Sequence, residues 1–204
     1  MDIIKDVKKL QKDKISKVIE KRIKEFKTLN KKGNLDWFSE LCFCLLTANS
    51  KAQTAINIQS ELKECFHIKT KDEISLCIRK HKHRFHNNKS KFILEARQYI
   101  NIKDIITKEE FPREWLVKNI KGLGYKEASH FLRNVGYADY AILDRHIIRA
   151  LHENGYIKEI PKTLTKKYYL DVEKVLKKIG EKLKLNQDEL DLYIWYLKTG
   201  KVLK

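Results

Sequence analysis

Apolar residues recur along this chain at spacings of three and four, the period of a helix face that packs against a core. Two such stripes open the chain on either side of a break near Lys12: Ile3, Ile4, Val7 and Leu10, then Ile15, Val18, Ile19, Ile23 and Phe26. Residues 35–49, LDWFSELCFCLLTAN, are apolar on nearly every side, so we expect this helix at the centre of the core.

The remaining pattern predicts further helices and no strand. Helices are expected over residues 51–66, 72–81, 91–100, 144–154 and 186–199, with Gly155 ending the fourth. Another starts at Pro112, and a long amphipathic helix follows Pro161 with Thr163 or Thr165 as its cap. Residues 81–90, HKHRFHNNKS, are predicted to be a basic loop with an aromatic tip. The fold class is therefore all-α, with about ten helices.

The charge of the chain indicates a kind of partner. Lys and Arg number 44 against 27 Asp and Glu, which gives a net charge of +17 over 204 residues. This excess suggests a polyanionic partner, although solubility or a lysine-rich proteome would give the same composition. No apolar run reaches the roughly 18 residues of a membrane span, and the N-terminus has no signal-peptide core. We therefore expect a cytoplasmic protein.

The four cysteines, Cys42, Cys44, Cys65 and Cys77, lack the C-x-x-C spacing that is typical of a zinc site. We interpret them as reduced and mostly buried thiols. No cysteine follows Cys77 in the sequence.

The strongest local motif is the turn in KNIKGLGYKEASHFL, residues 118–132, where Gly122 and Gly124 flank Leu123. Glycine permits left-handed backbone and close approach, and Leu123 can fill the core between the two helices. The amides near Gly124 would begin the second helix and bind an anion. With Ala128, the pattern h-x-G-h-G-x-x-x-A indicates a helix–hairpin–helix that docks DNA phosphates without reading bases. A turn that merely joins two packed helices is the alternative.

Lys126 lies in the first turn of the second hairpin helix. A lysine nucleophile must be neutral, and the free amine has a pKa of about 10.4. A helix N-terminus and neighbouring cations, for which Lys121 and Arg145 are candidates, disfavour the ammonium form. We therefore interpret Lys126 as a nucleophile, with a phosphate contact or a solvated lysine as the alternatives.

Asp144 ends the apolar run of YAILDRHIIRAL, residues 140–151, and begins a helix. The commonest role of Asp at this place is an N-cap, which holds the carboxylate rigid and ionised. Such a carboxylate can steady a sugar cation as a glycosidic bond breaks, or orient an attacking amine. Leu143 and Ile147 would anchor it, and Arg145 and His146 would add phosphate contacts or a local charge pair.

GLGYKEASHFLRNVG followed by AILDRHIIR resembles the helix–hairpin–helix superfamily of DNA base-excision glycosylases, and most of all its second, archaeal-type family of 8-oxoguanine DNA glycosylase/lyases. The resemblance covers nearly the whole chain. It implies a two-lobed fold with the active site in the cleft between the lobes. Residues 31–136 would form a barrel-like lobe with the hairpin, and residues 1–30 with 137–204 a lobe with the catalytic Asp and the C-terminal tail.

Two features depart from the wider superfamily. The segment before Asp144, VGYADYAILD, has one glycine and no proline. The four-cysteine iron–sulfur cluster of the endonuclease III branch is also lacking, because no cysteine lies near the C-terminus.

The resemblance assigns roles in chemistry and in binding the DNA backbone. Lys126 would form a Schiff base and Asp144 would be the essential carboxylate. A monovalent Na or K ion would be held by the carbonyls of Ile120 and Leu123, and no other cofactor is expected. The residues expected to contact the DNA backbone are Lys121, Gly122, Leu123, Gly124, Tyr125, Arg145 and His146.

The resemblance also suggests how the base is read. Asn49 or Phe85 would fill the gap left by the extruded base, with a helix C-cap and a loop anchor as the alternatives. 8-Oxoguanine differs from guanine by O8 and by an N7 that donates, so discrimination requires an acceptor aimed at N7–H. The terminal carboxylate of Lys204 would supply it beside Trp195, unless Trp195 is ordinary core and the tail is disordered.

The expected function follows from these residues and the resemblance. The chain would be a monomeric, nucleoid-associated enzyme that removes 8-oxoguanine from double-stranded DNA and then nicks the abasic strand by β-elimination. The alternatives are a non-catalytic helix–hairpin–helix DNA-binding module and a glycosylase for a different damaged base.

Overall fold

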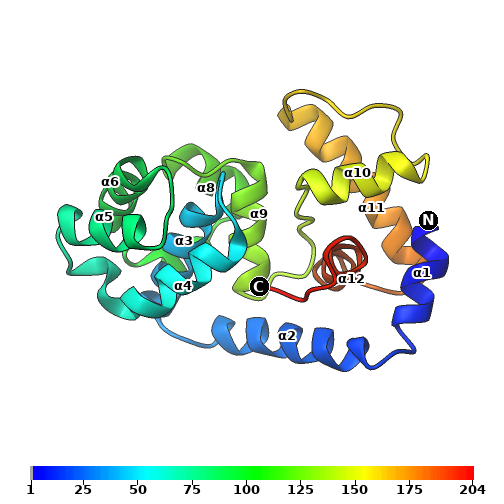
Figure 1. Cartoon of the computed structure of the whole chain (residues 1–204), viewed down its shortest axis with the longest axis horizontal. Coiled ribbons are helices and arrows are strands. Elements are labelled where there is room, and N and C mark those ends of the chain that lie inside the picture. Colours follow the sequence, from blue (N-terminus) through cyan, green and yellow to red (C-terminus); the bar gives the residue numbers. More distant parts are fainter. Residues whose placement is uncertain (1) are drawn as a thin grey trace. The chain divides into compact units, whose positions relative to one another are not determined.

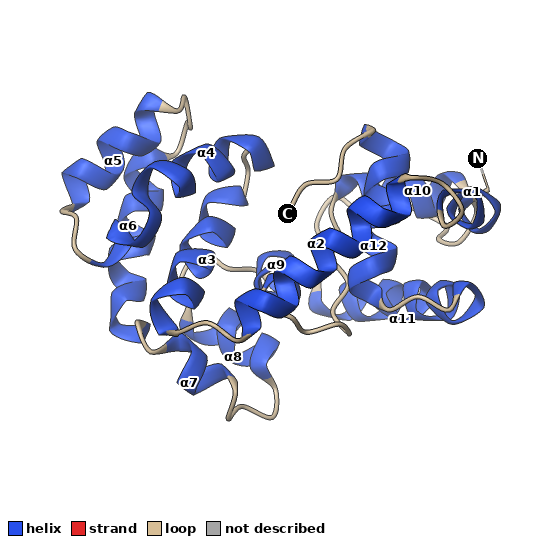
Figure 2. Ribbon diagram, turned by 90° about the horizontal axis from the view of Figure 1, so that it is seen from below, coloured by secondary structure: helices blue, strands red, loops and turns tan. Residues whose placement is uncertain are grey.

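The computed structural model describes residues 2–204. Within this range the regular secondary structure is helical and there is no strand (Figure 1 and Figure 2). The prediction of an all-α chain is therefore confirmed. The described chain has two 3-10 helices, Lys63–His67 and Arg97–Tyr99. Its twelve α-helices are α1 (Ile3–Leu10), α2 (Ile15–Asn30), α3 (Asn34–Thr47), α4 (Ala52–Leu62), α5 (Lys71–Lys80), α6 (His86–Ala96), α7 (Ile102–Ile106), α8 (Pro112–Asn119), α9 (Tyr125–Asn134), α10 (Arg145–Glu153), α11 (Lys166–Leu183) and α12 (Gln187–Thr199).

The chain divides into two compact units. One unit is continuous, Thr28–Val135, and the other joins the residues up to Lys27 with Gly136–Lys204. None of the helices in residues 2–204 is both long enough and apolar enough to cross a membrane.

Helix α3 forms the centre of the Thr28–Val135 unit, as its apolar sequence predicts. Its residues from Trp37 to Thr47 are buried except for Ser39, and it contacts α4, α6, α7 and α9. A helix that is apolar on all sides must be covered on all sides, which explains this placement.

Helix α9 is fixed to α3 by an aromatic contact and a buried polar network. The rings of Trp37 and Phe131 meet edge to face, with 5.9 Å between their centroids. Asn134 Nδ2 donates to Glu40 Oε1 over 2.6 Å, and Arg133 donates to Asn134 Oδ1. Buried polar groups that are satisfied in this way hold a helix in one position.

The prediction of a loop over residues 81–90 is wrong in its second half, because α6 already begins at His86. Although this segment is mostly polar, one face of α6 carries Ser90, Ile93 and Ala96 at spacings of three, and all three are buried. Lys89 is buried on the same helix, which packs against α5 and α3. The short helix α7 was not predicted either.

The second unit gathers α1, α10 and α11 around α12, which contacts all three (Figure 1). The predicted break near Lys12 is confirmed, since α1 ends at Leu10 and α2 begins at Ile15. Ile19, Ile23 and Phe26 form the buried stripe of α2, whereas Val18 is 48% exposed and does not belong to it.

Two predicted helix ends are confirmed. The Thr165 hydroxyl accepts from Tyr168 N–H at the start of α11, so Thr165 rather than Thr163 is the cap. Gly155, with φ of +72°, follows the last residues of α10 in the left-handed conformation that glycine favours.

Candidate active site

The hairpin joins α8 to α9 through residues 120–124, as the glycine pattern predicts. Ile120 and Leu123 are buried, so Leu123 does fill the core below the turn. Helix α9 begins at Tyr125 with Gly124 as its N-cap, and Ala128 is fully buried on its inner face. The buried side chains of Ile120 and Leu123 therefore anchor the turn in the core, while Gly122 and Gly124 remain exposed.

Gly122 is required by both its conformation and its surroundings. Its φ is +93°, and a Cβ placed on it would lie 2.5 Å from Cδ2 of Phe92 on α6. The hairpin backbone thus packs directly against an aromatic ring, which no larger residue at this position would permit.

Gly122→Ala is expected to lower the free energy of unfolding by about 1–3 kcal/mol, because the left-handed conformation and the Phe92 clash both oppose the methyl group. Urea denaturation measures the change. Gly33→Ala is the matched control, since Gly33 has φ of −81° and nothing within 4 Å of the added Cβ. Equal stability of the two variants would contradict the requirement for glycine at Gly122.

The first amide of the hairpin helix is occupied by a side chain of the same helix. Gly124 N–H donates to Glu127 Oε2 over 3.3 Å. The sequence predicts instead an amide that faces a bound anion directly. A DNA phosphate that used the Gly124 amide would have to replace the Glu127 carboxylate.

Lys126 is partly buried and paired with the same carboxylate. Its side chain is 29% exposed, and its Nζ lies 3.0 Å from Glu127 Oε1. The expected cation Lys121 is itself paired, 3.6 Å from Glu95 Oε2. Each of these two hairpin lysines therefore has a carboxylate beside it, which the sequence analysis did not predict.

A buried lysine that the sequence did not single out lies near this pair. Lys89 on α6 is only 5% exposed. Burial lowers the pKa of Lys89 to about 8, with Glu127 opposing the shift and Lys126 adding to it. The register of Ser90, Ile93 and Ala96 was the available signal, since it places Lys89 beside the buried face.

Asp144 is the N-cap of α10, as predicted. Its Oδ1 accepts from the amides of His146, over 2.8 Å, and Ile147, over 2.9 Å. Leu143 and Ile147 are buried on either side, which anchors the carboxylate. Both amide hydrogen bonds end on Oδ1, so the cap does not require Oδ2.

Among the residues expected to contact DNA and the base, His146 and Trp195 are in contact with each other. The rings of His146 and Trp195 meet edge to face, 4.9 Å between centroids, and both side chains are half-buried. The Trp195 indole N–H is buried and has no hydrogen-bond partner among the described residues. Arg145 is exposed at the start of α10, and Lys204 is half-buried at the end of the non-helical tail after Gly200.

The two candidate gap-filling residues lie on segments that are linked by a buried histidine. Asn49 is exposed and left-handed, with φ of +61°, just after the end of α3. Phe85 is 39% exposed, with Arg84 over its ring. His83 Nε2 lies 3.0 Å from the Leu46 carbonyl oxygen, and the Phe85 amide donates to His83 Nδ1. His83 therefore ties the Phe85 segment to the end of α3.

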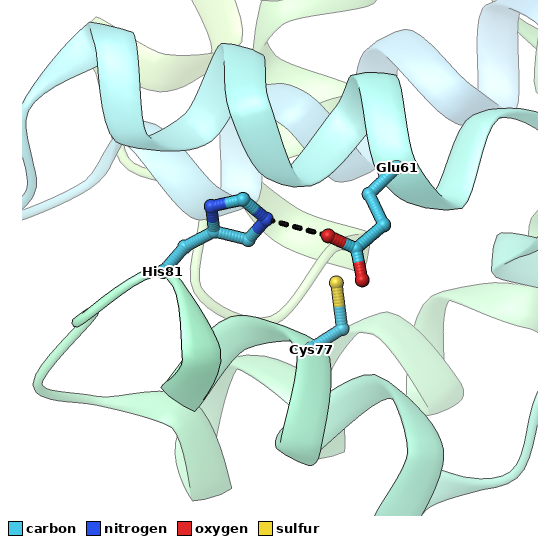
Figure 3. Close-up of side chains that lie close together, drawn as sticks. All are labelled: Glu61, Cys77 and His81. Carbon is cyan, nitrogen blue, oxygen red and sulfur yellow. Dashed lines mark hydrogen bonds and ion pairs between the residues drawn. The ribbon is translucent and has the colours of Figure 1, made fainter.

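Two places offer atoms that could hold a metal ion. Ile120 keeps a carbonyl lone pair beyond the one that accepts from Leu123 N–H, which suits a monovalent cation in the turn. Ligand atoms of Glu61, Cys77 and His81 lie within 4.8 Å of one another (Figure 3).

Contacts with Lys80 and His81 explain the position of the Glu61 carboxylate in this cluster. Lys80 Nζ lies 3.0 Å from both carboxylate oxygens of Glu61, and His81 Nε2 lies 2.9 Å from Oε2. These contacts lower the pKa of Glu61, the Lys80 hydrogen bond most. Burial raises the pKa of Cys77 to about 11, which keeps it a thiol. The cluster thus fastens α4 to α5.

A helix–hairpin–helix with a lysine in its second helix, followed by an aspartate that caps a later helix, on a basic all-helical chain, defines the class of helix–hairpin–helix DNA glycosylases. A family model described as 8-oxoguanine DNA glycosylase matches residues 19–185. The chain belongs to this family.

Similar proteins are known over the full length. The 8-oxoguanine DNA glycosylase/AP lyase of Methanocaldococcus jannaschii is 52% identical over 100% of both chains, and that of Aquifex aeolicus is 43% identical over 100% of both. The crystal structure of the M. jannaschii enzyme with a 15mer DNA containing 8-oxoguanine matches with a TM-score of 0.97 over 98% of this chain and 99% of that one. An endonuclease III–DNA complex, 18% identical with a TM-score of 0.59, shares the fold.

Proposed function

We infer that this chain is a DNA repair enzyme that removes 8-oxoguanine and then cleaves the abasic strand. Membership of the 8-oxoguanine DNA glycosylase family, with relatives named glycosylase/AP lyase over the full length, carries this inference. The lysine at the start of the hairpin helix gives it a chemical basis, because a lysine nucleophile joins base removal and strand cleavage in one intermediate.

Lys126 is the proposed nucleophile. Its neutral amine attacks C1′ of the damaged nucleotide, the C1′–N9 bond breaks, and the base leaves with a proton. Opening of the sugar ring gives a Schiff base between Lys126 and C1′. Loss of a proton from C2′ then expels the 3′ phosphate, which nicks the strand on the 3′ side of the lesion.

Asp144 is proposed to stabilise the positive charge that develops on the sugar as the base leaves. Its geometry supports this role, because two backbone amides hold Oδ1 and leave Oδ2 without a capping function. A fixed, ionised carboxylate stabilises such charge without reorganisation during the reaction.

The hairpin is proposed to dock the DNA backbone through amides and lysines. Lys121, Tyr125, Arg145 and His146 would add contacts, and the carbonyls of Ile120 and Leu123 would hold a monovalent cation between protein and phosphate. The net charge of +17 would make this affinity strongly salt-dependent. Such a substrate would place the enzyme with the nucleoid, where it would act as a monomer.

Base recognition is proposed for the half-buried residues of α12 and the tail. Trp195 would stack on the extruded base, and the terminal carboxylate of Lys204 would accept from N7–H of 8-oxoguanine. Asn49 or Phe85 would fill the gap in the duplex, since both are accessible at the ends of neighbouring elements.

Borohydride reduction tests the function with the unmodified enzyme. A duplex with 8-oxoguanine is expected to give a covalent protein–DNA adduct, because the reductant fixes the Schiff base. Undamaged duplex serves as the control and should give none. Binding without an adduct would indicate a DNA-binding module, and a larger yield with oxidised pyrimidines would indicate a glycosylase for another lesion.

A further inference from the structure

A thiol, an imidazole and a carboxylate meet in the Thr28–Val135 unit, and the proposed reaction uses none of them. The ligand atoms of Cys77, His81 and Glu61 all lie within 4.8 Å of one another. Figure 3 shows the three side chains pointing toward a common place. Sulfur, imidazole nitrogen and carboxylate oxygen are the donors that proteins use to bind Zn²⁺.

The local sequence places two of these donors on one side of a helix. Cys77 lies in the last turn of α5, and His81 is the C-cap residue four positions later. Side chains four residues apart on a helix lie one above the other, so both can reach one ion. Glu61 comes from the last turn of α4, which packs against α5. This Cys-x-x-x-His spacing differs from the C-x-x-C pattern that is typical of zinc sites.

The separations are close to those of a single tetrahedral site. Two donors that bind one Zn²⁺ at about 2.0–2.3 Å lie about 3.3–3.7 Å from each other. His81 Nε2 and Glu61 Oε2 are already 2.9 Å apart, and a rotation of these two side chains brings them to Cys77 Sγ. Cys77 is 7% exposed, whereas the side chains of Glu61 and His81 are 38% and 21% exposed. An ion can therefore enter from solvent and reach the thiol.

The Lys80 ammonium group already pairs with one of the donors. Its Nζ lies 3.0 Å from both carboxylate oxygens of Glu61, and its side chain is 64% exposed. Exposed ion pairs of this kind contribute little, because both side chains are flexible and solvated. A divalent ion that binds the carboxylate, the thiolate and the imidazole together would therefore displace Lys80 into solvent.

We propose that Glu61, Cys77 and His81 form a binding site for a zinc-like divalent cation, which fastens α4 to the end of α5. Thiolate and imidazole ligands select Zn²⁺ over Mg²⁺ and Ca²⁺, which prefer oxygen. Three protein ligands leave the fourth position to water. The Cys77 thiol releases its proton to solvent on binding, and His81 binds through a neutral ring nitrogen. The site is independent of the proposed repair reaction.

Cobalt and zinc titrations of the full-length protein test this site, after chelator treatment and in a reducing buffer without thiols. Co²⁺ is expected to give a thiolate-to-metal charge-transfer band in the near ultraviolet, and Zn²⁺ should abolish the band by displacing Co²⁺. Competition with a chromophoric chelator measures the Zn²⁺ affinity.

Cys77→Ser should lose the charge-transfer band, because it removes the thiolate. Loss of a mere hydrogen-bond partner of a metal ligand costs about 10–100-fold in affinity, so loss of this ligand should weaken Zn²⁺ binding by at least about 100-fold. Cys65→Ser is the matched control, since Cys65 is a half-buried thiol of the same unit outside the cluster. It should keep both the band and the affinity.

Two variants at less buried positions separate a metal site from a cluster that only joins two helices. Lys80→Gln removes the ammonium group that the ion must displace, so it should bind Zn²⁺ about two- to fivefold more tightly than wild type. His81→Gln should keep the charge-transfer band but bind Zn²⁺ at least about tenfold more weakly. Zn²⁺ should also raise the Tm of the wild type, and not that of Cys77→Ser.

Specific results would overturn the proposal. One is a wild-type protein that gives no charge-transfer band at saturating Co²⁺, and another is an unchanged band and affinity in Cys77→Ser. Should Cys77→Ser fail to fold, an unchanged Zn²⁺ affinity in His81→Gln would have the same meaning. Zn²⁺ binding in Lys80→Gln no tighter than in the wild type would count against Glu61 as a ligand.

Discussion

Lys126→Gln is expected to abolish the borohydride-trapped adduct with 8-oxoguanine duplex and to reduce strand cleavage by at least about 10³-fold, because an amide cannot form a Schiff base. Glutamine keeps a polar side chain of similar length at this partly buried position, so the fold should be unchanged. Adduct yield on a denaturing gel, together with DNA affinity, measures the effect.

Lys121→Gln is the matched control for this change. Lys121 belongs to the same hairpin but is exposed. Its Nζ lies 3.6 Å from Glu95 Oε2, whereas Lys126 pairs with Glu127. Its loss should weaken DNA binding modestly and reduce the salt dependence, while the adduct still forms under saturating conditions. An adduct of undiminished yield in Lys126→Gln would remove Lys126 from the role of nucleophile.

Asp144→Asn is expected to slow release of 8-oxoguanine by about 10²–10³-fold with little change in stability. The two amides of α10 bond to Oδ1 alone, and asparagine offers a carbonyl oxygen in its place. Because asparagine caps helices about as well as aspartate, the substitution removes the charge and keeps the cap. Single-turnover base release and urea denaturation on the same preparation separate the two quantities.

Asp144→Ala completes this comparison, since it removes both the cap and the charge. We expect it to lose about 1 kcal/mol of stability in addition to the loss in activity. Wild-type rates in Asp144→Asn would show that Asp144 acts only as a cap.

The Glu127 carboxylate links binding to chemistry in a way that the two predictions above do not test. It accepts from the Gly124 amide and pairs with Lys126, so it occupies two groups that the proposed reaction needs. A phosphate at the hairpin would compete with the Glu127 carboxylate for the Gly124 amide.

The sequence determined the features that depend on neighbours within about one helical turn. The Asp144 and Thr165 caps are hydrogen bonds over two or three residues, and the helical stripes follow from a spacing of three and four. The hairpin was predicted for the same reason, because its glycines and Leu123 act locally. Family resemblance added the proposed roles of Lys126 and Asp144.

Only the tertiary structure decided the electrostatics around the hairpin. The burial of Lys89 depends on how α6 packs against other helices, and the contact of Phe92 with Gly122 joins residues 30 positions apart. Even the Lys126–Glu127 pair was not predictable, because adjacent residues on a helix do not normally face each other. It forms because the Glu127 side chain turns back to accept from the Gly124 amide. The partners of this carboxylate depend on which amides and amines the fold leaves within its reach.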